Sequence, residues 1–167
     1  MKKYAAWIVL AAAALLLLAW MPFERSDVAR LAPVEALMVS VEQGQVVLDG
    51  GDCRGLGATW QEAWQDLRQG AEGQVFLGTA EQVVLTGSAV ELLPQVANSG
   101  VLRPAAQICV CPGPAPDPKQ AAAYLSAHET GATLQWVQAA LLRGDDFTLP
   151  VLMETEGGLR LYAAANR

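Results

Sequence analysis

Hydrophobic residues fill the first part of the chain almost without interruption. From Tyr4 to Phe23 there are 20 consecutive residues without a charge. A helix of that length spans about 30 Å, the thickness of the hydrocarbon core of a bilayer. We therefore expect residues 1–23 to form a cytoplasmic start followed by a transmembrane signal-anchor. Basic residues before the span and aromatic rings near its ends favour the membrane interface. These expected interface anchors are Lys2, Lys3, Tyr4, Trp7 and Trp20.

A cleaved secretory signal is the alternative interpretation of this segment. The uncharged run exceeds the roughly 7–15 residues of a signal core, and bulky side chains such as Trp20 stand where cleavage requires small ones. We therefore favour a single-pass anchor with an extracytoplasmic body, although Arg25 and Arg30 leave the inverted orientation open. Lipoprotein processing is excluded because the first cysteine is Cys53, far beyond the apolar run.

Beyond the apolar segment, the pattern predicts a β-hairpin and then a helix. Apolar residues alternate over 37–41 and recur over 46–48 after a Gly-containing break. A Gly-rich connection over 50–57 leads to Thr59, whose hydroxyl can cap a helix while Glu62 completes a capping box. The next apolar residues fall on one helical face, which we expect to pack on the sheet. They are Trp60, Ala63, Trp64 and Leu67.

Short strands and one interrupted helix are expected next. Apolar runs predict strands over 75–77, 82–85 and 106–111. A helix is expected over 89–97, kept short or kinked by Pro94, because proline removes a backbone donor and clashes one turn back. The pattern therefore predicts an α+β body with a mixed or antiparallel sheet packed with helices.

A proline-rich segment over 113–118 is predicted to be a linker, because it suits neither a helix nor a central strand. It divides the body into an expected first domain, 24–112, and an expected second domain, 119–167. Asp117 and Pro118 are typical of a helix start, and Gly144 of a helix end. The elements expected past the linker are helices to about His128 and over 133–143, and a hairpin of 147–153 with 159–163.

Composition and charge narrow the function classes. The chain has 167 residues, 53% of them hydrophobic, which leaves room for about one domain plus an appendage and disfavours disorder. It carries 17 acidic against 11 basic residues, a formal net charge of −6. Nucleic-acid binding is disfavoured because no segment supplies a clustered basic patch. A single histidine and three cysteines leave little material for triad or metal chemistry, and no cofactor is expected.

The three cysteines are the main candidates for chemistry. Cys109 and Cys111 share one face of a predicted strand, where their β-carbons lie about 6–7 Å apart, whereas a disulfide needs about 3.8 Å. Buried free thiols are therefore favoured. A disulfide from Cys53 to one of them, or an extracytoplasmic thiol-redox enzyme that uses Cys109 or Cys111, remains open.

Three further groups have ordinary structural interpretations. A zinc site would need all three cysteines and His128, whose spacing lacks the usual close pairs, so His128 is expected to be solvated or to cap a helix end. The Gly-rich stretch 50–57 meets no nucleotide-binding pattern and is expected to be a flexible turn. Asp145 and Asp146 are expected to be solvated loop charges.

Several short motifs taken in order resemble the C-subunit family, Ger(x)C, of spore germinant receptors. The resemblance includes the extended segment 23–31, the hairpin, and the Gly-x-Thr-x-x-Glu-Ala helix start at 57–63. It also includes the strand pair 76–78 and 83–85, in which a Leu-Gly turn at 77–78 leads into the second strand. Residues 133–151 and 158–163 are similar to the start of the family's second domain.

The resemblance implies a noncatalytic, extracytoplasmic accessory subunit. Such a subunit works with multi-span partners in the cell or spore inner membrane of a spore-forming Gram-positive bacterium. Relative to the family, this chain looks like a short form that lacks the lipoprotein cysteine and the C-terminal domain. A truncated relic without a partner is the remaining alternative.

Overall fold

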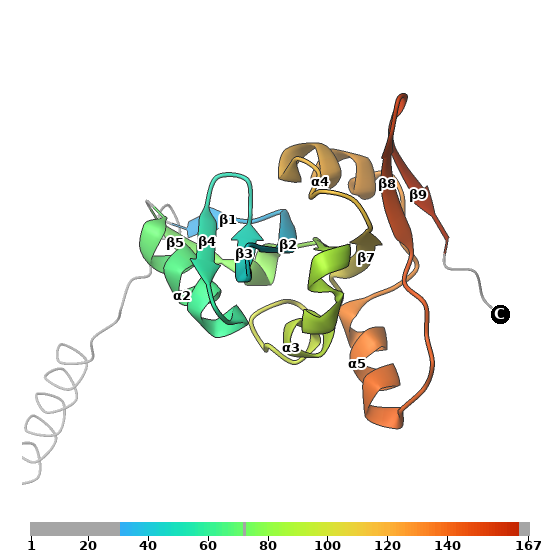
Figure 1. The fold of residues 1–167 in the computed structure, drawn as a ribbon, viewed down its shortest axis with the longest axis horizontal. Helices are drawn as coiled ribbons and strands as arrows, with labels where there is room; N and C mark the ends of the chain where they lie inside the picture. Colours follow the sequence, from blue (N-terminus) through green and yellow to red (C-terminus); the bar gives the residue numbers. More distant parts are fainter. Residues whose placement is uncertain (1–30, 72, 164–167) are drawn as a thin grey trace, which may run out of the picture. The chain divides into compact units, whose positions relative to one another are not determined.

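A seven-stranded mixed sheet organises the described part of the chain (Figure 1). The structure, a computed structural model, describes residues 31–71 and 73–163. The strand order is β4-β3-β2-β6-β7-β8-β9, with β2, β6, β7 and β8 parallel and antiparallel pairs at both ends. The predicted mixed sheet with helices is thus confirmed. The strands are β2 (Ala36–Glu42), β3 (Gln45–Asp49), β4 (Arg54–Gly57), β6 (Gln82–Thr86), β7 (Gln107–Cys111), β8 (Val151–Thr155) and β9 (Gly158–Tyr162).

A second, two-stranded sheet stands apart from the first. It pairs β1 (Leu31–Pro33) in parallel with β5 (Gln74–Phe76), with Pro33 opposite Phe76. The strand predicted at 75–77 is therefore present, but it joins β1 and not the main sheet. A 3₁₀ turn, η2 (Leu77–Thr79), then carries the chain into β6.

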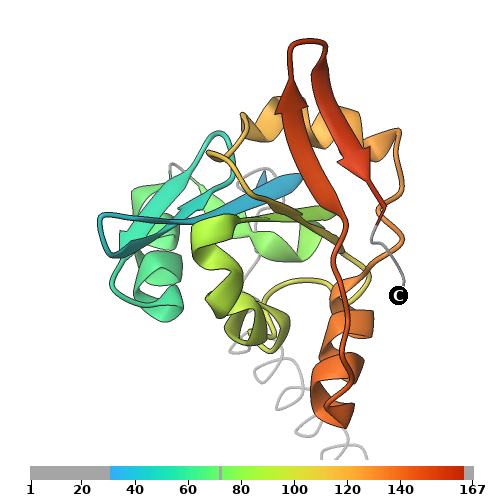
Figure 2. The same cartoon turned by 45° about the vertical axis from the view of Figure 1, so that its right-hand side comes forward.

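Helices cover the two faces of the main sheet unequally (Figure 2). One face carries a large apolar cluster with α2 (Trp60–Gly70), η3 (Gly87–Leu92), α3 (Leu93–Ala97) and α5 (Leu134–Arg143). The other carries a smaller cluster with α4 (Pro118–Ser126). Successive side chains of β6 point to opposite faces of the sheet. Val83 and Leu85 pack in the large cluster, and Val84 packs in the small one. Burial on both faces explains why this strand is apolar at successive positions.

The predicted helix starts and ends are confirmed at atomic level. The Thr59 hydroxyl accepts a hydrogen bond from the Glu62 amide at 3.2 Å, and the Glu62 carboxylate accepts one from the Ala58 amide at 2.8 Å. The Glu62 half of the box therefore reaches one residue further back than the usual pattern, in which the capping residue's own amide is the donor.

The caps of the later helices follow the same logic. Asp117 accepts from the amide of Gln120 at the start of α4, and Thr133 accepts from the amide of Trp136 at the start of α5. Gly144 ends α5 with φ of 69°, a left-handed conformation that glycine adopts without strain.

The Gly-rich stretch 50–57 is not simply the flexible turn that its composition predicts, because β4 forms in its second half. A β-carbon on Gly55 would lie 2.2 Å from the carbonyl oxygen of Ala63 and 2.4 Å from the β-carbon of Leu67. One on Gly57 would lie 2.3 Å from the Ala63 nitrogen. These two glycines therefore allow α2 to pack directly on the backbone of an edge strand.

The proline-rich segment 113–118 falls inside one compact unit that begins at Leu31. It connects β7 to α4, and the sheet continues beyond it through β8 and β9. In the described residues it therefore joins elements of a single sheet-and-helix body, where the sequence suggests a boundary between two domains. The side chains of α4 pack on the sheet, and this packing holds the residues after the proline-rich segment to those before it. The composition of the segment does not reveal such packing.

The C-terminal hairpin is present, although its first strand begins at Val151 and not at the predicted Phe147. Phe147 packs against the large cluster instead. The hairpin joins the sheet through one paired position, Val110 with Val151, and it projects beyond the other strands in Figure 2. It is also fastened to α4, because the Leu161 amide donates to the Tyr124 hydroxyl at 3.0 Å.

The predicted transmembrane segment and its interface anchors, Lys2, Lys3, Tyr4, Trp7 and Trp20, lie outside the described residues. Among the helices that the structure does describe, none has the length and apolar character needed to cross a bilayer.

Candidate functional site

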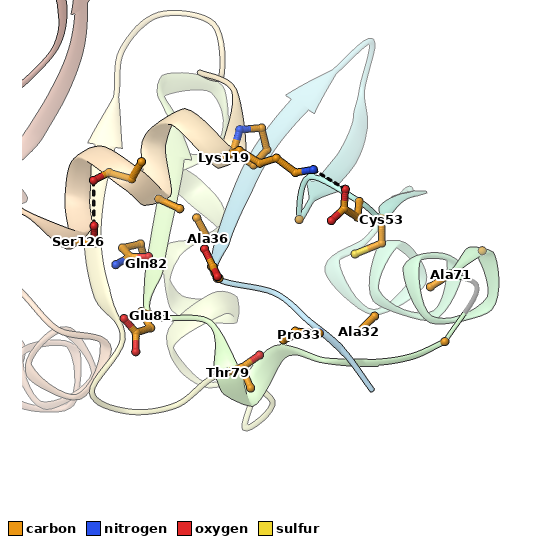
Figure 3. A pocket seen from close by; sticks show the side chains of 18 residues that line it. Ala32, Pro33, Ala36, Cys53, Ala71, Thr79, Glu81, Gln82, Lys119 and Ser126 are labelled. Atoms are coloured by element: carbon orange, nitrogen blue, oxygen red, sulfur yellow. Dashed lines mark hydrogen bonds and ion pairs between the residues drawn. The ribbon is translucent and has the colours of Figure 1, made fainter. Parts of the chain in front are cut away.

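A groove opens beside the first residues of β2 and β6 (Figure 3). Its walls also come from α4, the β3–β4 connection, the end of α2 and the small β1–β5 sheet, and its volume is about 1100 Å³. Concave sites of this kind are the usual places for ligands. Small side chains leave the space open; they include Ala32, Ala36, Ala71, Ala122 and Ala123.

Gln82 is a largely buried residue in the wall of this groove. It is the first residue of β6, and only 3% of its surface is exposed. Its backbone amide donates to the carbonyl oxygen of Glu35 at 3.2 Å. No hydrogen bond joins its side-chain amide to another residue of the described ranges. In Figure 3 it is drawn between Glu81 and Ser126. Neither amide atom is among the fully buried polar atoms that lack a partner in the described residues, so the amide reaches the open groove and is a candidate ligand contact.

Carboxylates dominate the charge around the groove. Glu35 and Glu81 precede β2 and β6, and the Glu81 amide donates to the Glu35 carbonyl oxygen at 2.8 Å, which holds the two residues together. Asp52 forms an ion pair with Lys119 at 2.7 Å, which neutralises both. This hydrogen bond raises the pKa of Lys119, so its charge persists at neutral pH. The remaining charge of the groove is negative.

Thr79 holds together the part of the groove wall that lies between the two sheets. Its hydroxyl oxygen lies 2.7 Å from the carbonyl oxygen of Phe76 and 3.2 Å from that of Val34, and it can donate its one hydrogen to either. The same oxygen accepts a hydrogen bond from the Val34 amide at 3.1 Å. The side chain therefore ties β5 and η2 to the segment between β1 and β2. It positions the wall of the groove, and its hydrogen-bonding capacity is already used.

The sequence prediction missed this groove. Glu81 and Gln82 stand at the junction of a predicted turn and strand, where polar residues are ordinary. A polar residue immediately before the apolar run 83–85 is the one available signal. It becomes informative only when the fold shows that Gln82 is buried.

The buried-thiol prediction is confirmed for Cys109 and Cys111, which are free and buried in the small cluster beside α4. Burial raises the pKa of the Cys109 thiol from its ordinary 9.0 to about 12, with a smaller contribution from Cys111. Burial also raises the pKa of the Cys111 thiol. A reactive thiol needs the opposite shift, so these environments disfavour the thiol-enzyme alternative.

The alternative disulfide from Cys53 is absent. Cys53 is a free thiol that lines the groove and packs against the large cluster, whereas Cys109 and Cys111 belong to the small cluster on the other face of the sheet. Burial, and then the charges of Asp49 and Asp52, raise the pKa of Cys53.

His128 has the helix-end role that its position predicts. Its Nδ1 lies 2.8 Å from the carbonyl oxygen of Tyr124 at the end of α4, and its ring stacks on the Tyr124 ring at 4.2 Å between centroids. Within residues 31–71 and 73–163, no three histidine, cysteine, aspartate or glutamate side chains converge as a metal site. Asp145 forms an ion pair with Arg143, and both are exposed, as expected of loop charges.

The thiols give a testable result. At pH 8 we expect iodoacetamide to leave Cys109 and Cys111 unmodified in the folded protein and to modify Cys53 slowly, because only the thiolate reacts. Asp52→Asn should speed modification of Cys53 severalfold, since removing a nearby negative charge lowers its pKa. Peptide mass spectrometry measures each site.

Asp146→Asn, which changes the same charge on an exposed loop, should leave the rate at Cys53 unchanged. Urea should expose all three thiols to the reagent. Rapid modification of Cys109 or Cys111 in the folded protein would instead support a thiol enzyme.

Comparison of this chain with family models, with curated proteins and with solved structures found no match in any of the three. Its function must therefore be argued from its own residues.

Proposed function

We propose that this chain is a noncatalytic accessory or binding subunit, held at a membrane by one helix with its body outside the cytoplasm. The observation that carries the proposal is the uncharged run from Tyr4 to Phe23, which is separated from the start of β1 by the seven residues 24–30. A run of that length suits a bilayer span. Lys2 and Lys3 before it favour a cytoplasmic start.

Tethering explains how a small body could act without tight binding. A membrane anchor keeps the body near membrane partners at high effective concentration, so weak contacts suffice for association. The described body offers a feature suited to such contacts, the open groove whose lining includes Gln82 and three carboxylates.

We further propose a place in a complex like the spore germinant receptors, beside multi-span subunits in the inner membrane of a Gram-positive cell or spore. The motif resemblance, including residues 57–63, is what supports this proposal, and in this chain the residues of that stretch form the start of α2. Gly57 admits α2, and Thr59 and Glu62 cap it. The burial of Cys109 and Cys111 weighs against the rival thiol-redox role.

Cell fractionation tests the proposed tether. The full chain should stay in membranes after an alkaline carbonate wash and should be digested by protease added to intact protoplasts. A variant lacking residues 1–23 should leave the membrane and lose all co-purification with multi-span proteins.

The matched control replaces residues 1–23 with an unrelated transmembrane segment of the same orientation, which should restore membrane retention. Release of the full chain by carbonate, or protection of its body from external protease, would overturn the proposal. Unchanged co-purification after removal of residues 1–23 would also contradict it.

A further inference from the structure

We infer that the groove beside β2 and β6 binds a short, extended peptide segment carrying lysine or arginine, with Gln82 pairing to the backbone N–H and C=O of one residue and Glu35 and Glu81 receiving the basic side chain. This inference deepens the proposed accessory role, on which it rests for the existence of a partner. It names the chemistry that the partner must present.

The size and lining of the groove favour a peptide over a compact small molecule. Its volume of about 1100 Å³ lies at or above the upper end of ordinary small-molecule sites, roughly 300–1,000 Å³. Alanine side chains and the backbone of Gly50, Gly70 and Gly73 form much of the wall. Such a wall lets another backbone approach closely, as a peptide requires.

The carboxamide of Gln82 indicates what part of the peptide binds deepest. A carboxamide presents one acceptor and two donors. An extended residue directs its own N–H and C=O to the same side, so the carboxamide can form a pair of hydrogen bonds with the N–H and C=O of one such residue. The amide has no hydrogen bond to a described residue and is not among the fully buried polar atoms that lack a partner, so it faces the groove, where an incoming peptide backbone can pair with it.

The charges select a basic side chain beside that peptide group. No ion pair joins Glu35 to any residue within the described ranges, and its side chain is exposed at the groove. Glu81 lies 3.4 Å from Arg103, a long contact that leaves 57% of the Glu81 side chain exposed. An ammonium or guanidinium group would form shorter, charge-assisted hydrogen bonds with these carboxylates.

A bare metal ion fits these residues less well than an organic cation. Within the parts of the chain that the structure describes, no three side chains of metal-binding type converge. Asp52, the third carboxylate of the groove, is already paired with Lys119 at 2.7 Å. A lysine or arginine needs only one or two carboxylates, whereas hard cations such as Ca²⁺ take about 6–8 oxygen ligands.

An NMR titration of the purified full chain in a neutral maltoside detergent tests this inference. The probe is the blocked peptide acetyl-Ala-Lys-Ala-Lys-Ala-amide, followed by its Glu-for-Lys counterpart. The lysine peptide should shift the side-chain NH₂ signals of Gln82, which are identified by their loss in Gln82→Met. The glutamate peptide should shift nothing, and higher salt should weaken binding of the lysine peptide because the contact is charged.

Variants separate the two kinds of contact. The double substitution Glu35→Gln with Glu81→Gln should raise the dissociation constant about tenfold or more. Gln82→Met should raise it about fivefold. The matched controls are Glu91→Gln with Glu156→Gln, and Gln74→Met, which lie outside the groove and should change nothing. Unchanged thermal unfolding verifies that each variant is folded.

Equal binding of the two peptides, or no shift at Gln82, would overturn the inference. Binding of 1,5-diaminopentane as tightly as the lysine peptide would overturn its peptide part, because that amine offers no peptide group. Each of these results is independent of membrane attachment, so failure here is distinguishable from failure of the proposed tether.

Discussion

Alanine in place of Gly55 is expected to lower the free energy of unfolding by about 3 kcal/mol or more, and in the extreme to prevent folding. The new β-carbon would lie 2.2 Å from the Ala63 carbonyl oxygen and 2.5 Å from the Leu67 nitrogen. Both are backbone atoms of α2, so no side chain can turn away to relieve the overlap. The helix must instead move off β4, which uncovers apolar surface of the large cluster.

Urea unfolding of the full chain in neutral detergent, followed by the far-ultraviolet circular dichroism of its helices and strands, measures the effect. Gly157→Ala is the matched control because its added β-carbon meets nothing within 4 Å. That variant should unfold at the wild-type urea concentration. Equal stability of the two variants would show that α2 does not pack on Gly55 as described.

Truncating Leu85 to alanine is expected to cost about 3 kcal/mol of unfolding free energy. Leu85 lies in β6, between β2 and β7, and its side chain is fully buried in the large cluster. Removal of its terminal carbons leaves a cavity that neighbouring strands cannot collapse to fill, because their positions are fixed by hydrogen bonds on both sides.

Leu142→Ala removes the same atoms from a side chain that is 80% exposed on α5. It should change the unfolding free energy by less than about 0.5 kcal/mol. A large loss at Leu142 with little loss at Leu85 would contradict the burial of Leu85 and the exposure of Leu142. Urea unfolding in the same detergent compares both variants directly.

Local patterns predicted most of the elements because their causes are local. The hairpin of β2 and β3 follows from alternating apolar residues, and the start of α2 follows from Thr59 and Glu62. The helix expected over 89–97 is split into η3 and a short α3, with Pro94 in the first turn of α3. In each case the determining residues lie within a few positions of the element.

Features that depend on distant pairing escaped prediction. Nothing near 54–57 shows that a Gly-rich run will pair with β3, since the pairing depends on α2 covering those glycines. Likewise, β5 leaves the main sheet because β1 provides its partner. The groove also arises only when α4 is brought beside the beginnings of β2 and β6, so Gln82 and Glu35 gave no usable signal in the sequence.

The β8–β9 hairpin is attached to the rest of the body through both β7 and α4. Only Val110 and Val151 are paired across β7 and β8, whereas Leu152 and Leu159 pack in the small cluster and Leu161 bonds to Tyr124 of α4. A displacement of this hairpin would therefore reach α4 as well as β7, and α4 also forms one wall of the groove.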